Sequence, residues 1–135
     1  MTLAELKGDV VILACAVSAG IHGALAPAHF AESAGAGVGF VASSILLAAL
    51  AVVLTVRPAS SVPLAGAALV FAGLLGSYAL ATTTGLPLLH PQPEPVDGLA
   101  LATKAFEAVG LVTALNLLSR RLAVPPTPQP KGQRT

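Results

Sequence analysis

Charged residues are missing from long stretches of this sequence, which consist mainly of alanine, leucine, valine and glycine. The charge-free blocks extend from Val10 to Ala31, from Ser33 to Val56 and from Pro58 to Pro93. Each block is longer than the roughly 20 residues that a helix needs to cross the hydrocarbon core of a bilayer. A further apolar stretch, 98–118, is interrupted only by Lys104 and Glu107. The pattern therefore predicts membrane-spanning helices.

We expect an all-α protein, an integral membrane four-helix bundle with helices at about 9–28, 35–56, 64–85 and 98–118. The connections are short, so neighbouring helices should pack antiparallel. These helices form one transmembrane domain, 1–123. The proline-rich tail that follows, 124–135, should be disordered and cytoplasmic.

The first helix has an alternative interpretation as a cleaved signal sequence. The small-x-small triplet at positions 24–26 has the form of a cleavage site. However, Pro27 directly after it is unfavourable for cleavage, and Glu5 and Asp9 interrupt a basic N-terminal region. We expect this helix to be retained.

Basic residues are confined to one side of the four-helix arrangement, apart from Lys104. The others are Lys7, Arg57, Arg120, Arg121, Lys131 and Arg134. Lysine and arginine mark the cytoplasmic side of a multi-pass membrane protein. Both termini should therefore be cytoplasmic.

The two connections on the opposite side are acidic and contain histidine. The first is expected at 27–33, the second follows the third helix, and together they hold His29, Glu32, His90, Glu94 and Asp97. The second also contains Pro87, Pro91, Pro93 and Pro95, which favour a stiff, extended cap over the bundle. Asp97 directly precedes the fourth helix and should cap its N-terminus.

These connections carry a candidate metal site. Imidazole and carboxylate groups are the usual ligands of zinc and divalent copper, and a four-coordinate site could draw on His29, Glu32, His90 and Glu94. One extra helical turn after Pro27 would place His29 and Glu32 on the same face. We predict an outward-facing zinc or copper site; the alternative is that both histidines are simply solvated.

A second polar group lies inside the predicted helices. It consists of His22, Tyr78, Lys104 and Glu107, with Ser43 and Ser44 at a similar depth. A rise of about 1.5 Å per residue places all of them a few ångströms to the outer side of the helix midpoints. Ionisable groups near mid-bilayer cost about 2.5 kcal/mol or more and normally pair inside the bundle. We expect this intramembrane polar layer to lie beneath the acidic connections.

The members of the polar layer also have structural interpretations. Lys104 and Glu107 are three residues apart on one helix, so they can neutralise each other. His22 can be a hydrogen-bond partner of Glu107 or Tyr78. Cys15, two turns deeper than His22, should be a core residue.

Small residues recur at four-residue spacing in the first helix. Ala16, Gly20 and Ala24 form one face, and Ala19 and Gly23 form another. Such faces permit close approach of helices in lipid. Tight packing is expected along both.

Several other functions are not expected. A bis-histidine haem site needs two deep histidines, and only His22 is deep enough. A complete proton path is disfavoured because the inner half of the helices holds no acid or histidine to continue it. Phosphate-binding loops, dinucleotide fingerprints and nucleophile elbows are missing, and a net charge of +1 gives no case for nucleic acid.

Two stretches, "SAGIHGALAPAHFAES" and "TTTGLPLLHPQPEPVDGLALATKAFEAVGL", carry a resemblance to known sequences. They resemble small four-helix membrane proteins of the actinobacterial type, a group with no assigned activity. The shared positions are His22, His29, Glu32, 83–87, His90, 95–98, Lys104 and Glu107. The resemblance implies the four-helix architecture and the inner (plasma) membrane of a bacterium, and it implies no activity.

The favoured function is a non-enzymatic membrane protein that binds or handles a transition-metal ion at the outer His/carboxylate cluster. An accessory subunit of a larger membrane complex is the alternative, with the polar layer and the connections as its docking surface. A minimal transporter acting as a dimer is the third. The expected partners are the lipid bilayer and either a second copy or a larger membrane complex.

Overall fold

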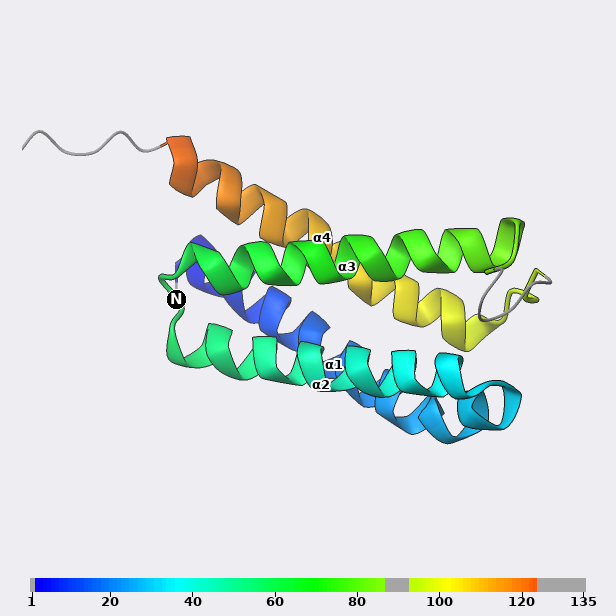
Figure 1. Cartoon of the computed structure of the whole chain (residues 1–135). Coiled ribbons are helices and arrows are strands. Elements are labelled where there is room, and N and C mark those ends of the chain that lie inside the picture. The colour runs from blue at the N-terminus through cyan, green and yellow to red at the C-terminus, as the bar shows by residue number, and fades with distance from the viewer. Residues whose placement is uncertain (1, 87–92, 124–135) are drawn as a thin grey trace, which may run out of the picture.

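The computed structural model describes residues 2–86 and 93–123. Within these residues the chain forms four α-helices and no β-strand: α1 Leu3–Glu32, α2 Ala34–Val56, α3 Ser61–Thr83 and α4 Gly98–Ala123 (Figure 1). All four helices are long and apolar enough to cross a membrane. The predicted all-α class is confirmed for this part of the chain. The predicted tail, 124–135, and His90, Pro87 and Pro91 lie outside the described residues.

Helix α1 begins earlier than predicted because Thr2 and Glu5 form a capping box. The Thr2 hydroxyl accepts a hydrogen bond from the Glu5 amide at 3.2 Å, and the Glu5 carboxylate accepts one from the Thr2 amide at 2.6 Å. These bonds satisfy amides that the first turn would otherwise leave free. The charged residues before Asp9 therefore belong to the helix.

The prediction of a loop at 27–33 was wrong. Helix α1 continues through Pro27 to Glu32, and Ser33 alone connects it to α2. Proline costs one hydrogen bond inside a helix, but the pattern resumes in the next turn, where the Ser33 amide donates to the His29 carbonyl at 2.9 Å. The Ser33 hydroxyl then accepts from the Ala36 amide at 3.0 Å, so one residue caps both helices.

Helix α3 also begins before its predicted start. Pro63 lies in its first turn, where a missing amide N–H is tolerated because the first four have no intrahelical partner. The helix ends at Thr83, and Gly85 follows with φ 72, a left-handed conformation that glycine adopts without a Cβ clash. The helical conformation thus ends just before this glycine.

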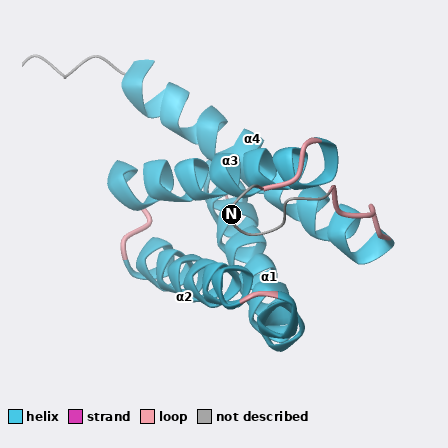
Figure 2. Ribbon diagram, turned by 45° about the vertical axis from the view of Figure 1, so that its right-hand side comes forward, coloured by secondary structure: helices cyan, strands magenta, loops and turns pink. Residues whose placement is uncertain are grey.

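The helices pack as an up-and-down bundle. Helix α1 contacts α2 and α4, and α3 contacts α4 and, least extensively, α2 (Figures 1 and 2). Both described chain ends and the α2–α3 connection lie at one end, which we call the terminal end. The α1–α2 connection and the start of α4 lie at the other, which we call the cavity end.

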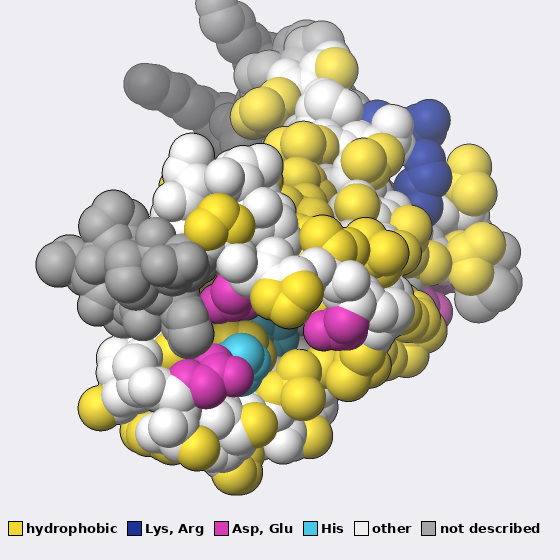
Figure 3. All heavy atoms as spheres, turned by 90° about the vertical axis from the view of Figure 1, so that its right-hand side faces the viewer, with side chains coloured by type: hydrophobic (Ala, Val, Ile, Leu, Met, Phe, Trp, Pro, Cys, Tyr) yellow, Lys and Arg dark blue, Asp and Glu magenta, His cyan; other side chains and the backbone are white. Residues whose placement is uncertain are grey.

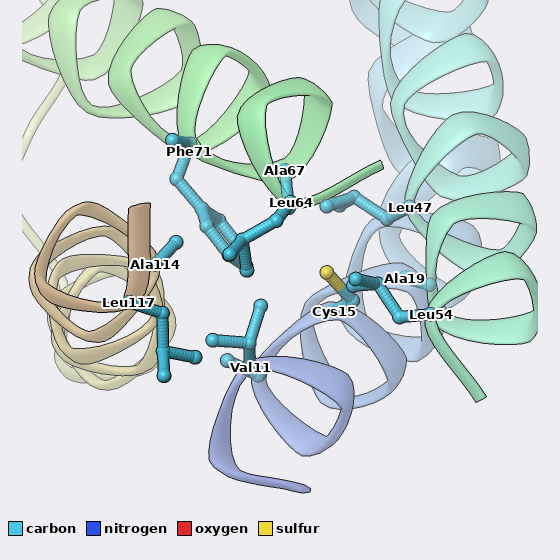
Figure 4. Close-up of a cluster of buried hydrophobic side chains, with 12 residues drawn as sticks. Val11, Cys15, Ala19, Leu47, Leu54, Leu64, Ala67, Phe71, Ala114 and Leu117 are labelled. Atoms are coloured by element: carbon cyan, nitrogen blue, oxygen red, sulfur yellow. The ribbon is translucent and has the colours of Figure 1, made fainter. Parts of the chain in front are cut away.

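A solid apolar core fills the bundle towards the terminal end. Figure 4 shows Val11 of α1 between Phe71 of α3 and Leu117 of α4, with Cys15 of α1 nearer to Leu47 of α2. Phe71 is fully buried and packs against Gly110, where an added Cβ would lie 2.6 Å from the ring. The prediction that Cys15 is a core residue is confirmed.

The two small-residue faces of α1 differ in their surroundings. Gly23 lies against Ser44 of α2, whose hydroxyl donates to the Ala19 carbonyl at 2.8 Å. The expected close packing therefore holds for the face formed by Ala19 and Gly23. The other face, with Ala16, Gly20 and Ala24, is exposed, so the expectation of tight packing along it is not met within the chain.

Polar contacts at the terminal end lie on the outside of the bundle. The Lys7 ammonium donates to the Asn116 amide oxygen at 2.6 Å, joining α1 to α4. The Arg121 guanidinium donates to the carbonyls of Pro58, Ala59 and Ser60 at 2.7, 3.1 and 2.8 Å. These contacts close the terminal end without placing polar groups in the core.

Candidate functional site

A cavity of about 510 Å³ opens at the cavity end of the bundle. All four helices and the segment before α4 line it, and its polar lining includes His22, His29, Glu32, Tyr78, Glu94, Asp97 and Lys104. In Figure 3 histidine and carboxylate side chains surround a hollow on this face. Members of both predicted polar groups thus line a single cavity, whereas Glu107 is not among its lining residues.

One wall of the cavity carries a histidine–carboxylate pair from the last turns of α1. His29 Nδ1 lies 2.9 Å from Glu32 Oε2. The His29 ring also stacks on Phe40 of α2, with 3.7 Å between ring centroids, which fixes the orientation of its nitrogens. The prediction that an extra helical turn places His29 and Glu32 on one face is confirmed.

The segment before α4 contributes two more carboxylates to the cavity. Glu94 is half-buried, and its amide donates to the Ala81 carbonyl at 2.9 Å, which holds the segment against the end of α3. Asp97 Oδ1 accepts from the Ala100 amide at 2.8 Å. The predicted N-cap role of Asp97 is thus confirmed, and capping occupies one of its oxygens.

The predicted metal ligands are brought together in part. His29 and Glu32 contact each other, and Glu94 lines the same cavity. Across 2–86 and 93–123, no three or more His, Cys, Asp or Glu side chains form a group that could hold a metal ion. His90, the fourth predicted ligand, is outside the described residues.

His22 and Lys104 form the floor of the cavity, and a fully buried carboxylate lies behind them. Glu107 of α4 is 0% exposed. It accepts from the Lys104 ammonium at 2.7 Å and from the Ser18 hydroxyl of α1 at 2.8 Å. A buried carboxylate is tolerated when its charge is paired and its oxygens are hydrogen-bonded. The predicted Lys104–Glu107 pair is confirmed, and Ser18 joins it to a second helix.

His22 completes the floor from α1. Its Nδ1 lies 2.9 Å from the Ser18 carbonyl, and because a carbonyl only accepts, this nitrogen carries a proton. Its Nε2 is 3.9 Å from Glu107 Oε1, which is too far for a direct hydrogen bond. The predicted hydrogen bond from His22 to Glu107 or Tyr78 is therefore wrong for the described residues: His22 bonds to the Ser18 carbonyl of its own helix instead.

Tyr78 adds a third kind of polar group. The Lys104 ammonium lies 5.5 Å from the centre of its ring, within the range of a cation–π contact. The Tyr78 hydroxyl is buried and has no hydrogen-bond partner among the described residues. Buried hydroxyls normally have one, so this hydroxyl is available to a molecule or ion that enters the cavity.

Sequence reasoning missed two residues that organise the site. Ser18 was not recognised as the donor to Glu107. Phe40 was not singled out, yet its ring stacks on His29 and lies 5.1 Å from that of His22. The four-residue spacing of Ser18 and His22 was the available signal for Ser18; nothing in the sequence marked Phe40.

Directly below Glu107, towards the terminal end, the interior of the bundle becomes apolar. Gly110 lies one helical turn below Glu107 and is in contact with Phe71 and Ala14. Phe71 and Ala14 belong to the apolar core. The cavity is therefore a blind pocket closed by packed hydrophobic side chains.

No protein-family model, curated protein or solved structure matches this chain. The resemblance to four-helix proteins of the actinobacterial type accordingly stays a prediction. The described residues form a concave site whose walls carry carboxylates and histidines.

Proposed function

We propose that this chain is a multi-pass protein of a bacterial inner membrane, with both termini in the cytoplasm, that binds a zinc or copper ion in the cavity at its outer end. Four apolar helices support the membrane part of this proposal. Large apolar side chains also cover the outer surface: Ile45, Leu69 and Val112 are 65%, 75% and 66% exposed. In a bilayer these side chains would face lipid and need no other partner.

The observation that carries the metal proposal is the His29–Glu32 pair on the cavity wall. Two ligands bound to one tetrahedral ion at about 2.0–2.1 Å lie about 3.3 Å apart. His29 Nδ1 and Glu32 Oε2 are already 2.9 Å apart. An ion can replace the shared proton after a shift of about half an ångström, and it would release that proton on binding.

Further ligands for the ion are available nearby. Glu94 lines the same cavity, and His90 precedes it by four residues in the sequence. Water can fill the remaining positions, as is common at sites that keep an open coordination position. Phe40 contributes by fixing the imidazole of His29 in one plane, in the way that packing around first ligands usually does.

The charge distribution of the cavity favours a cation. Lys104, the one lysine among the described residues that line the cavity, is neutralised by Glu107. Glu32, Glu94 and Asp97 also line the cavity. A cleft with acidic walls and an apolar surround raises the local concentration of cations.

A binding role is favoured over a complete transport path through one chain. Below Glu107 the bundle is filled by apolar side chains, including Phe71 and Leu117. An ion would have to cross this core without ligands, at a high desolvation cost. The ion is therefore captured and returned at the outer face.

A second candidate, an accessory subunit of a larger membrane complex, is favoured by the exposed face of Ala16, Gly20 and Ala24. Small residues at this spacing support helix association in lipid. An accessory subunit of this kind needs no metal, so metal content of the isolated protein separates the two candidates.

The experiment that tests the metal proposal is a titration of the purified protein in detergent with Zn²⁺ and with Cu²⁺, followed by metal analysis after desalting. We expect close to one ion per chain. His29→Phe keeps a ring for stacking on Phe40 but removes the nitrogen ligands, and it should weaken binding at least tenfold. Asp97→Asn is the matched control, because it removes a carboxylate from the same cavity and can still cap α4.

Two results would contradict the proposal. One is wild-type protein that retains no ion. The other is unchanged metal content in the double variant His29→Ala with His90→Ala. Circular dichroism of each variant establishes that the helices are intact, so that loss of the fold is not mistaken for loss of ligands.

A further inference from the structure

A second hollow, of about 470 Å³, lies between α2 and α3 near the terminal end. Its walls are apolar: Leu46, Leu50 and Val53 come from α2, and Val62 and Gly66 come from α3. These two helices make the least extensive contact of any neighbouring pair. The hollow is therefore a lengthwise groove on the outer surface of the bundle.

The groove has the dimensions of half a bilayer. Leu46, Leu50 and Val53 follow one stripe of α2, and the stripe ends at Arg57. At a rise of 1.5 Å per residue, Leu46 and Arg57 are about 16 Å apart along the axis. Half of a hydrocarbon core is about 15 Å. An acyl chain that starts at the level of Arg57 would end near the middle of the membrane.

The end of the groove is positively charged. Arg57 is exposed and lines it, and its guanidinium makes no hydrogen bond or ion pair with another described residue. Arg121 lies close by, because it donates to the carbonyl of Ser60, which also lines the groove. The first turn of α3 holds no acidic residue. Arg57 and Arg121 thus lie at this end of the groove, and the first turn of α3 beside them carries no carboxylate.

An unpaired guanidinium at the level of the headgroups suits a phosphate. Arginine presents parallel N–H donors that bind phosphate in a bidentate manner. A lysine or arginine near the surface attracts anionic lipids of the cytoplasmic leaflet. An apolar groove that begins at such a residue matches both parts of a phospholipid.

We propose that this groove binds one anionic phospholipid, with an acyl chain between α2 and α3 and its phosphate on Arg57. The proposal rests on the membrane insertion proposed above. It does not depend on the metal proposal, because the cavity lies at the opposite end of the bundle. The lipid closes the weakest interface of the bundle, so it should also stabilise the protein.

Native mass spectrometry in detergent tests this proposal. The protein is incubated with phosphatidylglycerol or with phosphatidylcholine of the same acyl chains, and bound lipids are counted. We expect one phosphatidylglycerol to bind at least tenfold more tightly than phosphatidylcholine. Arg57→Gln should reduce phosphatidylglycerol binding about tenfold, as expected for the loss of a charge-assisted bidentate contact.

Two controls make the result specific. Arg120→Gln removes an exposed arginine that does not line the groove, and it should leave lipid binding unchanged. Gly66→Leu fills the groove and should weaken the binding of phosphatidylglycerol while Arg57 is still present. Inorganic phosphate at millimolar concentration should not displace the lipid, because it lacks the acyl chain.

Equal binding of the two lipids, equal effects of Arg57→Gln and Arg120→Gln, or displacement by phosphate alone would each overturn the lipid site. A separate flotation experiment with liposomes tests membrane insertion. Protein that floats with liposomes but shows no preference for phosphatidylglycerol would refute the lipid site and leave the proposed function standing.

Discussion

The two ends of the bundle use the same four helices in opposite ways. Towards the terminal end the interior is filled by apolar side chains such as Phe71 and Leu117, and polar contacts such as Lys7–Asn116 lie outside. Towards the cavity end the interior is hollow and polar, and its surround is apolar. The comparison teaches that the interior of the bundle is closely packed where it is apolar and open where titratable side chains gather.

The difference is also energetic. At the terminal end, stability comes from contact between well-fitting apolar groups, as where Phe71 meets Gly110. At the cavity end it depends on the pairing of the buried charges of Lys104 and Glu107, because an unpaired charge there has no water to solvate it. Removing a charge should therefore destabilise the cavity end, whereas enlarging a side chain should destabilise the closely packed terminal end.

The largest expected effect concerns which end faces out of the cell. Ala31 and Ala59 are exposed at the cavity end and the terminal end respectively. Because basic residues remain cytoplasmic, a membrane-impermeant thiol reagent should label Ala31→Cys in intact cells and leave Ala59→Cys unlabelled until the cells are opened. The wild-type protein serves as the background, since Cys15 is 0% exposed. Labelling of Ala59→Cys in intact cells would reverse the proposed orientation.

The next effect concerns the buried pair on the cavity floor. Glu107→Ala leaves Lys104, whose side chain is only 16% exposed, without its counter-charge, and we expect a loss of about 3–5 kcal/mol in unfolding free energy. The double variant Lys104→Met with Glu107→Leu removes both charges and should recover most of that loss. Reversible unfolding in mixed micelles measures the unfolding free energies of the single and the double variant. A double variant as unstable as the single one would mean that pairing is not what the floor requires.

A smaller effect is expected from the packed half. Gly110→Ala places a Cβ 2.6 Å from the Phe71 ring and 2.9 Å from the Ala14 side chain. Overpacking of this kind costs about 1–3 kcal/mol. Gly73→Ala is the matched control, because a Cβ there meets nothing within 4 Å, and it should be neutral or slightly stabilising. Similar results for the two variants would show that the core near Phe71 is looser than its geometry indicates.

Much of the architecture was predictable because charge and hydropathy are strong signals in this sequence. The four helices, the core position of Cys15, the cap at Asp97 and the Lys104–Glu107 pair all follow from spacing along single helices. Each of these features depends on residues that are close in the sequence. Local rules are sufficient for them.

The features that were missed depend on context between helices. Proline at position 27 normally ends a helix, but here the following turn finds a cap in Ser33. The bond from Ser18 to Glu107 joins residues that are 89 positions apart. The stacking of Phe40 on His29 depends on how closely α1 approaches α2. The spacing of Ser18 and His22 along α1 indicates a shared face, but it does not reveal which residue of another helix Ser18 contacts.

The single-residue connection at Ser33 has a mechanical consequence. With the Ser33 amide committed to α1 and its hydroxyl committed to α2, the first two helices form a hairpin without slack at its tip. The wall that carries His29, Glu32 and Phe40 is therefore rigid. Any widening of the cavity entrance would have to come from the opposite wall, where Glu94 and Asp97 lie in the segment between α3 and α4.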